Sequence, residues 1–269
     1  MQDFSLQEII ESGQVFRWEI LKDGTYFGVL NSRIYRLKSE EDVYRDNFLY
    51  NYFDMDTDYG KIKEELSKDP IMKKAICSCP GMRILKQDLW ETMVSFIISQ
   101  NNNIPRIKSL INNLSKAYGK HIEGEYYDIP TPEVLSRLKV EDLEKLKLGY
   151  RAPYIIETAK RYVELGLNLS LDPKAKMIDN AKKEELSVEE YLTTFKGIGP
   201  KVANCISLFA LNNIDSFPID VWVKRVMNKL YGIEENDTKA MRNYAKEHFG
   251  KYAGIAQQYL FYYIRKIEE

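Results

Sequence analysis

Two residues with the chemistry of a covalent catalyst, Lys201 and Asp220, lie 19 positions apart in the sequence. A lysine amine can attack an electrophilic carbon, and a carboxylate can stabilise the positive charge that develops there. Pro200 suits the first helical position, so Lys201 falls in the first turn, where the helix dipole disfavours its charged form. Asp220 follows Pro218 and precedes an apolar periodic run, as a helix N-cap does. Taken alone, Lys201 would be a solvated surface lysine and Asp220 a simple helix cap. Together, at this spacing, they favour nucleophilic catalysis.

The lysine follows a glycine-rich connection between two expected helices. Residues 188–195 are amphipathic, and Gly197-Ile-Gly199 separates them from the helix that begins at Pro200. Both glycines can take positive φ and expose backbone N–H groups at little steric cost. The unpaired N–H groups that open the second helix form an anion site, for which DNA phosphate is an obvious ligand. An ordinary helix connection would show the same glycines.

The composition is that of a globular protein with no membrane span, and its net charge does not favour DNA binding, because DNA-binding domains are usually basic. Of the 269 residues, 44% are hydrophobic and 29% are charged, and the net charge is −1. Residues 196–266 carry 11 Lys and Arg against 6 Asp and Glu, so positive charge gathers around the hairpin, although a solvated helix face would look similar. Neither a run of about 18 apolar residues nor a secretory leader is present, so we expect a cytoplasmic protein, associated with the nucleoid in a prokaryote.

Cysteine and histidine are scarce. The three cysteines, Cys77, Cys79 and Cys205, are too few for a four-cysteine iron–sulfur cluster. The two histidines leave little material for a zinc site or a Ser-His-Asp triad. We therefore expect a metal-free mechanism with no cofactor, and this expectation leaves room for a structural monovalent or divalent cation at the hairpin.

The expected fold class is α+β. Residues 14–38 alternate like antiparallel strands around an Asp23-Gly24 turn, and from Ile84 onward the apolar period becomes helical. We expect a small N-terminal antiparallel β domain at 1–80 and a two-lobed all-α body at 81–269. Within that body we expect the hairpin at 188–211, a lysine- and glutamate-rich surface excursion at 171–186, and a C-terminal helix at 252–267.

The stretches from Phe195 to Ala203 and from Phe217 to Val221 resemble the helix-hairpin-helix plus Gly/Pro/Asp signature of the DNA glycosylase superfamily. In its bifunctional members the residue that matches Lys201 attacks the sugar, and the residue that matches Asp220 assists. The resemblance implies that backbone N–H groups of the hairpin glycines bind DNA phosphate.

The N-terminal run Ser12-Gly13-Gln-Val-Phe-Arg-Trp18 narrows the resemblance to the 8-oxoguanine DNA glycosylases. There the carbonyl that matches Gly13 accepts a hydrogen bond from the N7–H that only the oxidised base has. Guanine N7 is an acceptor, so the same carbonyl would repel the undamaged base. A turn before a strand is the plain alternative for Gly13.

Two further stretches resemble the parts of this family that enter the duplex. Asn101, within three consecutive asparagines, matches the residue that fills the gap left by the extruded base, and Arg106 matches a residue on the orphaned cytosine. Tyr150 matches the wedge and Arg151 the second cytosine reader. A solvated helix break explains the asparagines about as well.

The C-terminal stretch resembles the family's base pocket. Gln257 and Phe261 are four apart and share a helix face, so the resemblance places Gln257 on the Watson–Crick edge and Phe261 on one face of the base. Cys205, four residues after Lys201, would cover the other face. An aromatic at helical spacing is ordinarily core. One departure is Trp222, which stands where the animal enzymes have a phosphate-contacting histidine.

The resemblance spans residues 12–265 and implies a bifunctional repair enzyme. It would extrude 8-oxoguanine from duplex DNA, release it by attack of Lys201 on the sugar C1′, and nick the strand by β-elimination, acting as a monomer. One alternative is a glycosylase for another damaged base on the same scaffold. A non-catalytic helix-hairpin-helix DNA-binding protein is the other, but it would need neither Asp220 nor the pair Gln257 and Phe261.

Overall fold

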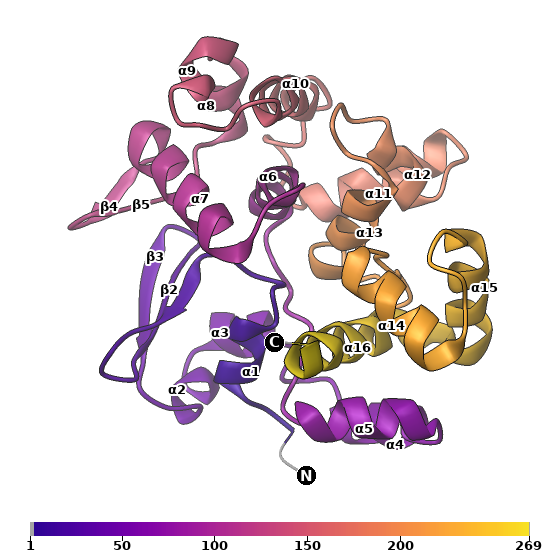
Figure 1. Ribbon diagram of the computed structural model, residues 1–269. Helices are drawn as coiled ribbons and strands as arrows, with labels where there is room; N and C mark the ends of the chain where they lie inside the picture. Colours follow the sequence, from indigo (N-terminus) through magenta and orange to yellow (C-terminus); the bar gives the residue numbers. More distant parts are fainter. Residues whose placement is uncertain (1–2, 269) are drawn as a thin grey trace. The chain divides into compact units, whose positions relative to one another are not determined.

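A computed structural model describes residues 3–268 (Figure 1). The chain divides into two compact units, each built from discontinuous segments. The first unit contains the described residues up to Gln14, then Lys38–Lys86, and the chain from Ser207 onward; the second contains Val15–Leu37 and Gln87–Ile206. The expected domains 1–80 and 81–269 stay predictions. No helix within residues 3–268 combines the length and the apolar content that a bilayer span requires.

The second unit holds a three-stranded antiparallel sheet in the order β1-β2-β3, formed by β1 (Trp18–Ile20), β2 (Tyr26–Leu30) and β3 (Arg33–Leu37). Gly28 of β2 pairs with Trp18, and a Cβ at Gly28 would come within 2.5 Å of the Trp18 indole. The indole therefore packs flat across the sheet. The expected small antiparallel sheet is confirmed, and its three strands lie within the expected range 14–38.

The rest of the second unit is helical apart from a short hairpin, β4 (His121–Glu123) and β5 (Tyr126–Tyr127). Nearly all of α6 is buried, and α7 and α10 pack against it (Figure 1). A helix that is apolar all round belongs in a core, so α6 is the central element of this unit. The helices are α6 (Leu89–Ser99), α7 (Ile104–Tyr118), α8 (Pro132–Ser136), α9 (Val140–Glu144), α10 (Arg151–Glu164), α11 (Pro173–Lys183), α12 (Val188–Thr193) and α13 (Pro200–Phe209).

Within the expected surface excursion at 171–186, residues Pro173–Lys183 form helix α11, most of whose side chains are exposed or half-buried. Asp172 caps α11 by accepting a hydrogen bond from the N–H of Ala175 at 3.0 Å. Met177 and Ala181 are buried, and α11 packs against α12. Two apolar residues four apart were enough to anchor a helix whose other positions are mostly charged.

The first unit is assembled around its C-terminal helix. α16 packs against α5 and α14 (Figure 1). Gly254 in its first turn donates its N–H to the carbonyl of Ile214 at 2.8 Å, and a Cβ there would lie 2.5 Å from the Ser216 carbonyl oxygen. The elements are α1 (Leu6–Glu11), α2 (Glu41–Tyr44), α3 (Asn47–Tyr52), α4 (Tyr59–Leu66), α5 (Pro70–Ser78), α14 (Val221–Tyr231), α15 (Thr238–His248), the 3₁₀ turn η1 (Gly250–Tyr252) and α16 (Ala253–Glu268).

Candidate active site

The hairpin between α12 and α13 has the geometry that the sequence indicates, with one correction. α13 begins at Pro200, as expected. Gly197 adopts φ +84°, the left-handed region that favours glycine. Gly199 does not adopt positive φ, and a Cβ there would meet nothing within 4 Å. The tight turn therefore depends on Gly197, and Gly199 is not required for it by backbone conformation.

Side chains of the second unit hold the carbonyl groups of the hairpin. Gln100 donates from Nε2 to the Gly197 carbonyl at 2.9 Å, and Thr158 donates its hydroxyl to the Lys196 carbonyl at 3.2 Å. A third bond runs from the guanidinium of Arg161 to the preceding Thr194 carbonyl at 3.1 Å. Three bonds to consecutive stretches of backbone fix the shape of the turn that leads into α13.

Lys201 lies in the first turn of α13 and is half-buried. Its Nζ stands 5.4 Å from the ring centroid of Phe96 on α6, within the range of a cation–π contact. Cys205, one helical turn further on, is 3% exposed. The contact with the Phe96 ring holds the end of the Lys201 side chain beside α6.

Asp220 is the N-cap of α14, as its position in the sequence indicates. Its Oδ1 accepts hydrogen bonds from the backbone N–H groups of Trp222 at 3.0 Å and Val223 at 2.8 Å. Trp222 is half-buried, and the guanidinium of Arg225 lies 4.8 Å from its ring centroid. Asp220 belongs to the first unit and Lys201 to the second.

The turn that contains Gly13 is fixed within the first unit. Gly13 adopts φ +79° just after α1. Gln14, fully buried beside it, donates to the Ser12 hydroxyl at 3.0 Å and to the Arg83 carbonyl at 2.9 Å. Gln258 of α16 donates to the Ser12 carbonyl at 2.9 Å. The structure thus brings the Gly13 turn and the predicted pocket helix together.

Within the described residues of α16, one buried side-chain polar atom has no hydrogen-bond partner. Gln257 is 4% exposed, and its Oε1 makes no hydrogen bond with the residues that the structure describes. A buried amide oxygen is normally paired, and one without a protein partner can accept a hydrogen bond from water or from a ligand. Phe261 is half-buried, and the guanidinium of Arg265 lies 5.4 Å from its ring centroid.

Sequence reasoning missed Gln258, although a second glutamine in an otherwise apolar helix signals a buried hydrogen bond.

The loop predicted to enter the duplex joins α6 to α7. Asn101 is exposed and adopts φ +48°, and Arg106 is exposed in the first turn of α7. Asn103 caps that helix by accepting from the N–H of Arg106 at 3.0 Å. Both predicted contacts are therefore presented to solvent.

The predicted wedge and second cytosine reader lie against the same loop. Tyr150 is 47% exposed, whereas Arg151 is 5% exposed and lies under the Tyr150 ring, 4.5 Å from its centroid. Arg151 donates to the carbonyl groups of Gln100 at 3.1 Å and Asn101 at 3.2 Å. Its donors are occupied by loop carbonyls, so reading a base would require these bonds to be exchanged.

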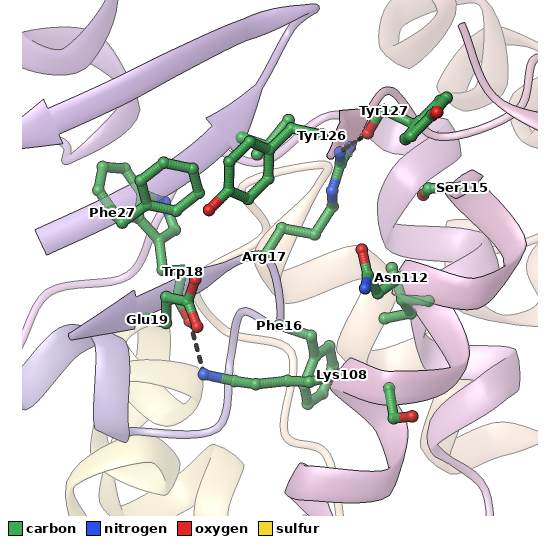
Figure 2. A pocket seen from close by; sticks show the side chains of 13 residues that line it. Phe16, Arg17, Trp18, Glu19, Phe27, Lys108, Asn112, Ser115, Tyr126 and Tyr127 are labelled. Carbon is green, nitrogen blue, oxygen red and sulfur yellow. Dashed lines mark hydrogen bonds between the residues drawn. The ribbon is translucent and has the colours of Figure 1, made fainter. Parts of the chain in front are cut away.

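A separate hollow of about 370 Å³ lies in the second unit between β1, α7 and β5, and no predicted site residue lines it (Figure 2). Arg17 forms ion pairs with Glu91 at 3.2 Å and Asp128 at 3.3 Å. Lys108 donates to the Trp18 carbonyl at 2.5 Å. Burial raises the pKa of Glu91 to about 7, although Arg17 opposes this shift. Because these cations already have protein partners, we assign the hollow no ligand.

In the described part of the chain no group of three or more His, Cys, Asp or Glu side chains is placed to hold a metal ion.

Comparison with known proteins places this fold and hairpin in one class. Residues 94–251 match the family model of the HhH-GPD superfamily base excision DNA repair proteins. Residues 1–93 match the N-terminal domain of 8-oxoguanine DNA glycosylase. The chain belongs to the 8-oxoguanine DNA glycosylase family of that superfamily, which confirms both the resemblance and the expected fold class.

Individual relatives agree with this assignment. An N-glycosylase/DNA lyase of Saccharomyces cerevisiae is 36% identical over 77% of the chain, which spans 56% of that relative's length. A structure of MBOgg1 with a low affinity DNA ligand is 42% identical, with a TM-score of 0.88, covering 100% of this chain and 94% of that one. The Clostridium acetobutylicum 8-oxoguanine glycosylase/lyase bound to dsDNA with cytosine opposite 8-oxoG is 37% identical, with a TM-score of 0.87 and the same coverage.

Proposed function

We propose that this chain is a bifunctional DNA glycosylase and lyase that removes 8-oxoguanine from duplex DNA. The observation that carries the proposal is the half-buried Lys201 in the first turn of α13, directly after a hairpin whose backbone is held by Gln100, Thr158 and Arg161. Family membership and the names of the relatives support the lesion and the duplex substrate.

In the proposed reaction the amine of Lys201 attacks the sugar C1′ of the extruded nucleotide. The bond from C1′ to the base nitrogen breaks, the base leaves with the electron pair and takes up a proton, and the amine loses a proton. The sugar ring opens to a Schiff base, and removal of a proton at C2′ allows the 3′ phosphate to leave by β-elimination. We assign to Asp220 the stabilisation of the positive charge that develops on the sugar.

Recognition of the base is assigned to four residues, Gly13, Gln257, Phe261 and Cys205. The Gly13 carbonyl accepts the N7–H that distinguishes 8-oxoguanine from guanine. Gln257 reads the Watson–Crick edge, and its unpartnered buried Oε1 supports this role. Phe261 is assigned to one face of the base and Cys205 to the other.

Contacts with the duplex are assigned to the exposed loop, the wedge and the hairpin. Asn101 fills the gap in the stack, Tyr150 acts as the wedge, and Arg106 and Arg151 read the orphaned cytosine. Phosphate contacts are assigned to the backbone at Gly197 and Gly199 and to Trp222 beside Asp220. The protein acts on duplex DNA as a monomer in this proposal.

Borohydride trapping tests the proposal. A duplex with one 8-oxoguanine is offered opposite each of the four bases, and borohydride reduces any Schiff base to a stable protein–DNA adduct. We expect an adduct with the wild-type protein, preferentially opposite cytosine, and none with Lys201→Gln, which should still bind the damaged duplex. Lys196→Gln, at an exposed lysine of the same hairpin, is the matched control and should trap DNA normally.

The outcomes separate the proposal from its alternatives. Base release that survives in Lys201→Gln would remove the nucleophile assignment. A DNA-3-methyladenine glycosylase of Bacillus subtilis is 31% identical over 68% of the chain, so a 3-methyladenine duplex belongs in the same assay. Release of that base without release of 8-oxoguanine would replace the substrate. Binding without release of either base would favour a non-catalytic DNA-binding protein.

A further inference from the structure

Gln100 contacts three of the segments to which the proposed function assigns separate roles. It ends α6, is half-buried, and immediately precedes Asn101. Its side chain donates to the Gly197 carbonyl of the hairpin at 2.9 Å. Its own carbonyl accepts from the Tyr150 hydroxyl at 3.1 Å and from Nε of Arg151 at 3.1 Å. All of these residues belong to the second unit.

The hydrogen bond from Gln100 to the hairpin is made to the carbonyl of Gly197, where one bond can fix the orientation of the backbone. Gly197 has no side chain and adopts φ +84°, so its neighbours decide the orientation of its carbonyl. Because a peptide unit is planar, a bond that fixes the Gly197 carbonyl also fixes the direction in which the chain enters Ile198. Lys201 follows in the first turn of α13. Gln100 is thereby linked to the backbone that carries the amine.

The contact with the wedge lies on the opposite end of the same residue. Tyr150 and Arg151 hold the Gln100 carbonyl, and a further guanidinium bond reaches the Asn101 carbonyl at 3.2 Å. Entry of Tyr150 or Asn101 into a duplex must exchange or move these bonds. The Gln100 carbonyl is bonded to Tyr150, and the Gln100 side chain is bonded to the hairpin. A movement of Tyr150 is therefore transmitted to the hairpin through this one residue.

We infer that Gln100 is a positioning residue that couples entry of the loop and wedge into the duplex to placement of the hairpin and Lys201. This inference rests on the proposed function. Its consequence is that the amine works best when a complete duplex has engaged Asn101 and Tyr150. A simpler role exists, because Nε2 also lies 3.3 Å from the Ile97 carbonyl and so helps to cap α6. The experiment must separate coupling from capping.

The probe is one abasic-site strand, offered either annealed opposite cytosine or single-stranded. The rate constant of borohydride trapping is measured under single-turnover conditions with saturating protein. The variant is Gln100→Met, which keeps the length of the side chain and removes its donor and acceptor. The matched control is Gln7→Met, because Gln7 is an exposed glutamine whose amide donates to the Glu11 carboxylate at 3.4 Å.

We expect the wild-type protein to trap the duplex faster than the single strand. Gln100→Met should lose about tenfold in the duplex rate, the effect of one hydrogen bond of about 1.4 kcal/mol, while the single-strand rate stays within about twofold. Gln7→Met should match the wild-type protein on both substrates. A loss confined to the duplex is what a simple cap of α6 does not produce.

The coupling is overturned if a folded Gln100→Met protein keeps the wild-type ratio of duplex to single-strand rates, whether both rates stay the same or both fall by the same factor. If Gln100→Met does not fold, Tyr150→Phe removes a donor to the Gln100 carbonyl and is judged by the same ratio. A wild-type protein that traps neither substrate would refute the proposed function and this inference together. An active wild-type protein with an unchanged ratio in the variant refutes this inference alone.

Discussion

The ring of Tyr154 lies directly against Gly197, so that a Cβ at that glycine would come within 2.4 Å of the ring. Gly197 also adopts φ +84°. Gly197→Ala therefore combines a left-handed alanine with a steric clash, and we expect it to lower the free energy of unfolding by about 2–4 kcal/mol. Thermal or urea unfolding followed by circular dichroism measures this loss, and the trapping rate should fall with it.

Gly199→Ala is the matched control for this substitution. Gly199 does not use positive φ, and a Cβ there would meet nothing within 4 Å. Its stability should change by no more than about 0.5 kcal/mol. Equal effects of the two alanines would show that the Tyr154 contact and the left-handed turn do not determine the hairpin.

Asp220 has two roles that substitution can separate. Its Oδ1 caps α14, and asparagine caps a helix about as well as aspartate. The free energy of unfolding of Asp220→Asn should therefore lie within about 0.5 kcal/mol of the wild-type value. The charge that we assign to catalysis is lost, so base release should slow by about a hundredfold or more. Asp220→Ala should lose activity and also about 1 kcal/mol of stability.

Asp237→Asn is the control, because Asp237 is a helix N-cap to which no role in the reaction is assigned. Asp237 caps α15 by accepting from the N–H of Ala240 at 2.8 Å. The asparagine should leave both stability and base release unchanged. Full activity in Asp220→Asn would mean that Asp220 is only a cap.

The local features of the hairpin could be predicted from sequence because short-range chemistry dictates them. Pro200 opens α13 and Asp220 caps α14 as expected, since both depend on neighbours within a few residues. The sequence indicates that Gly197 and Gly199 can both take positive φ, but it does not indicate that only Gly197 does so. The ring of Tyr154, 43 positions away, lies against Gly197, and no local pattern indicates this contact.

Long-range hydrogen bonds were beyond the sequence. Arg151 is predicted to read a base, and the sequence does not indicate that the free protein buries it against loop carbonyls. Neither Gln100 nor Gln258 carries a local pattern that names its partner, because each reaches a backbone carbonyl far along the chain. The apolar periodicity of 171–186 is weak because only two residues of α11, Met177 and Ala181, are buried.

Gln258 should affect discrimination between 8-oxoguanine and guanine. Its bond to the Ser12 carbonyl fixes the peptide that leads into Gly13, whose own carbonyl we assign to the N7–H. Gln258→Met frees that peptide, so the ratio of affinities for damaged and undamaged duplex should fall by about tenfold, the effect of one hydrogen bond. Fluorescence anisotropy in a Lys201→Gln background measures both affinities without reaction.

Tyr259→Phe is the matched control on the same helix. Its hydroxyl also donates to a backbone carbonyl, that of Met82, at 3.2 Å, and both residues are buried. This variant should lose about 1 kcal/mol of stability and keep the affinity ratio. The assignment of Gly13 to the N7–H loses its support if Gln258→Met preserves the ratio as well.

Glu91 should make the stability of the protein depend on pH. Burial raises its pKa from 4.5 to about 7 despite the ion pair with Arg17, so the folded state binds the proton more tightly than the unfolded state. The stabilisation from Glu91 is complete below pH 4.5 and disappears as pH rises through about 7. Relative to Glu91→Gln, the wild-type protein should therefore lose on the order of 3 kcal/mol across this range.

Urea unfolding of both proteins between about pH 4 and pH 8 measures this difference, in which titrating groups that do not interact with Glu91 cancel. Glu133→Gln is the control of opposite sign. Burial raises the pKa of Glu133, but hydrogen bonds from Thr131 and Asn168 outweigh it and hold the pKa below 4.5. The wild-type advantage over Glu133→Gln should therefore be present above pH 4.5 and disappear as pH falls. A stability difference for Glu91→Gln that is flat with pH would show that the pKa of Glu91 is the same in the folded and unfolded states, with Arg17 offsetting the effect of burial.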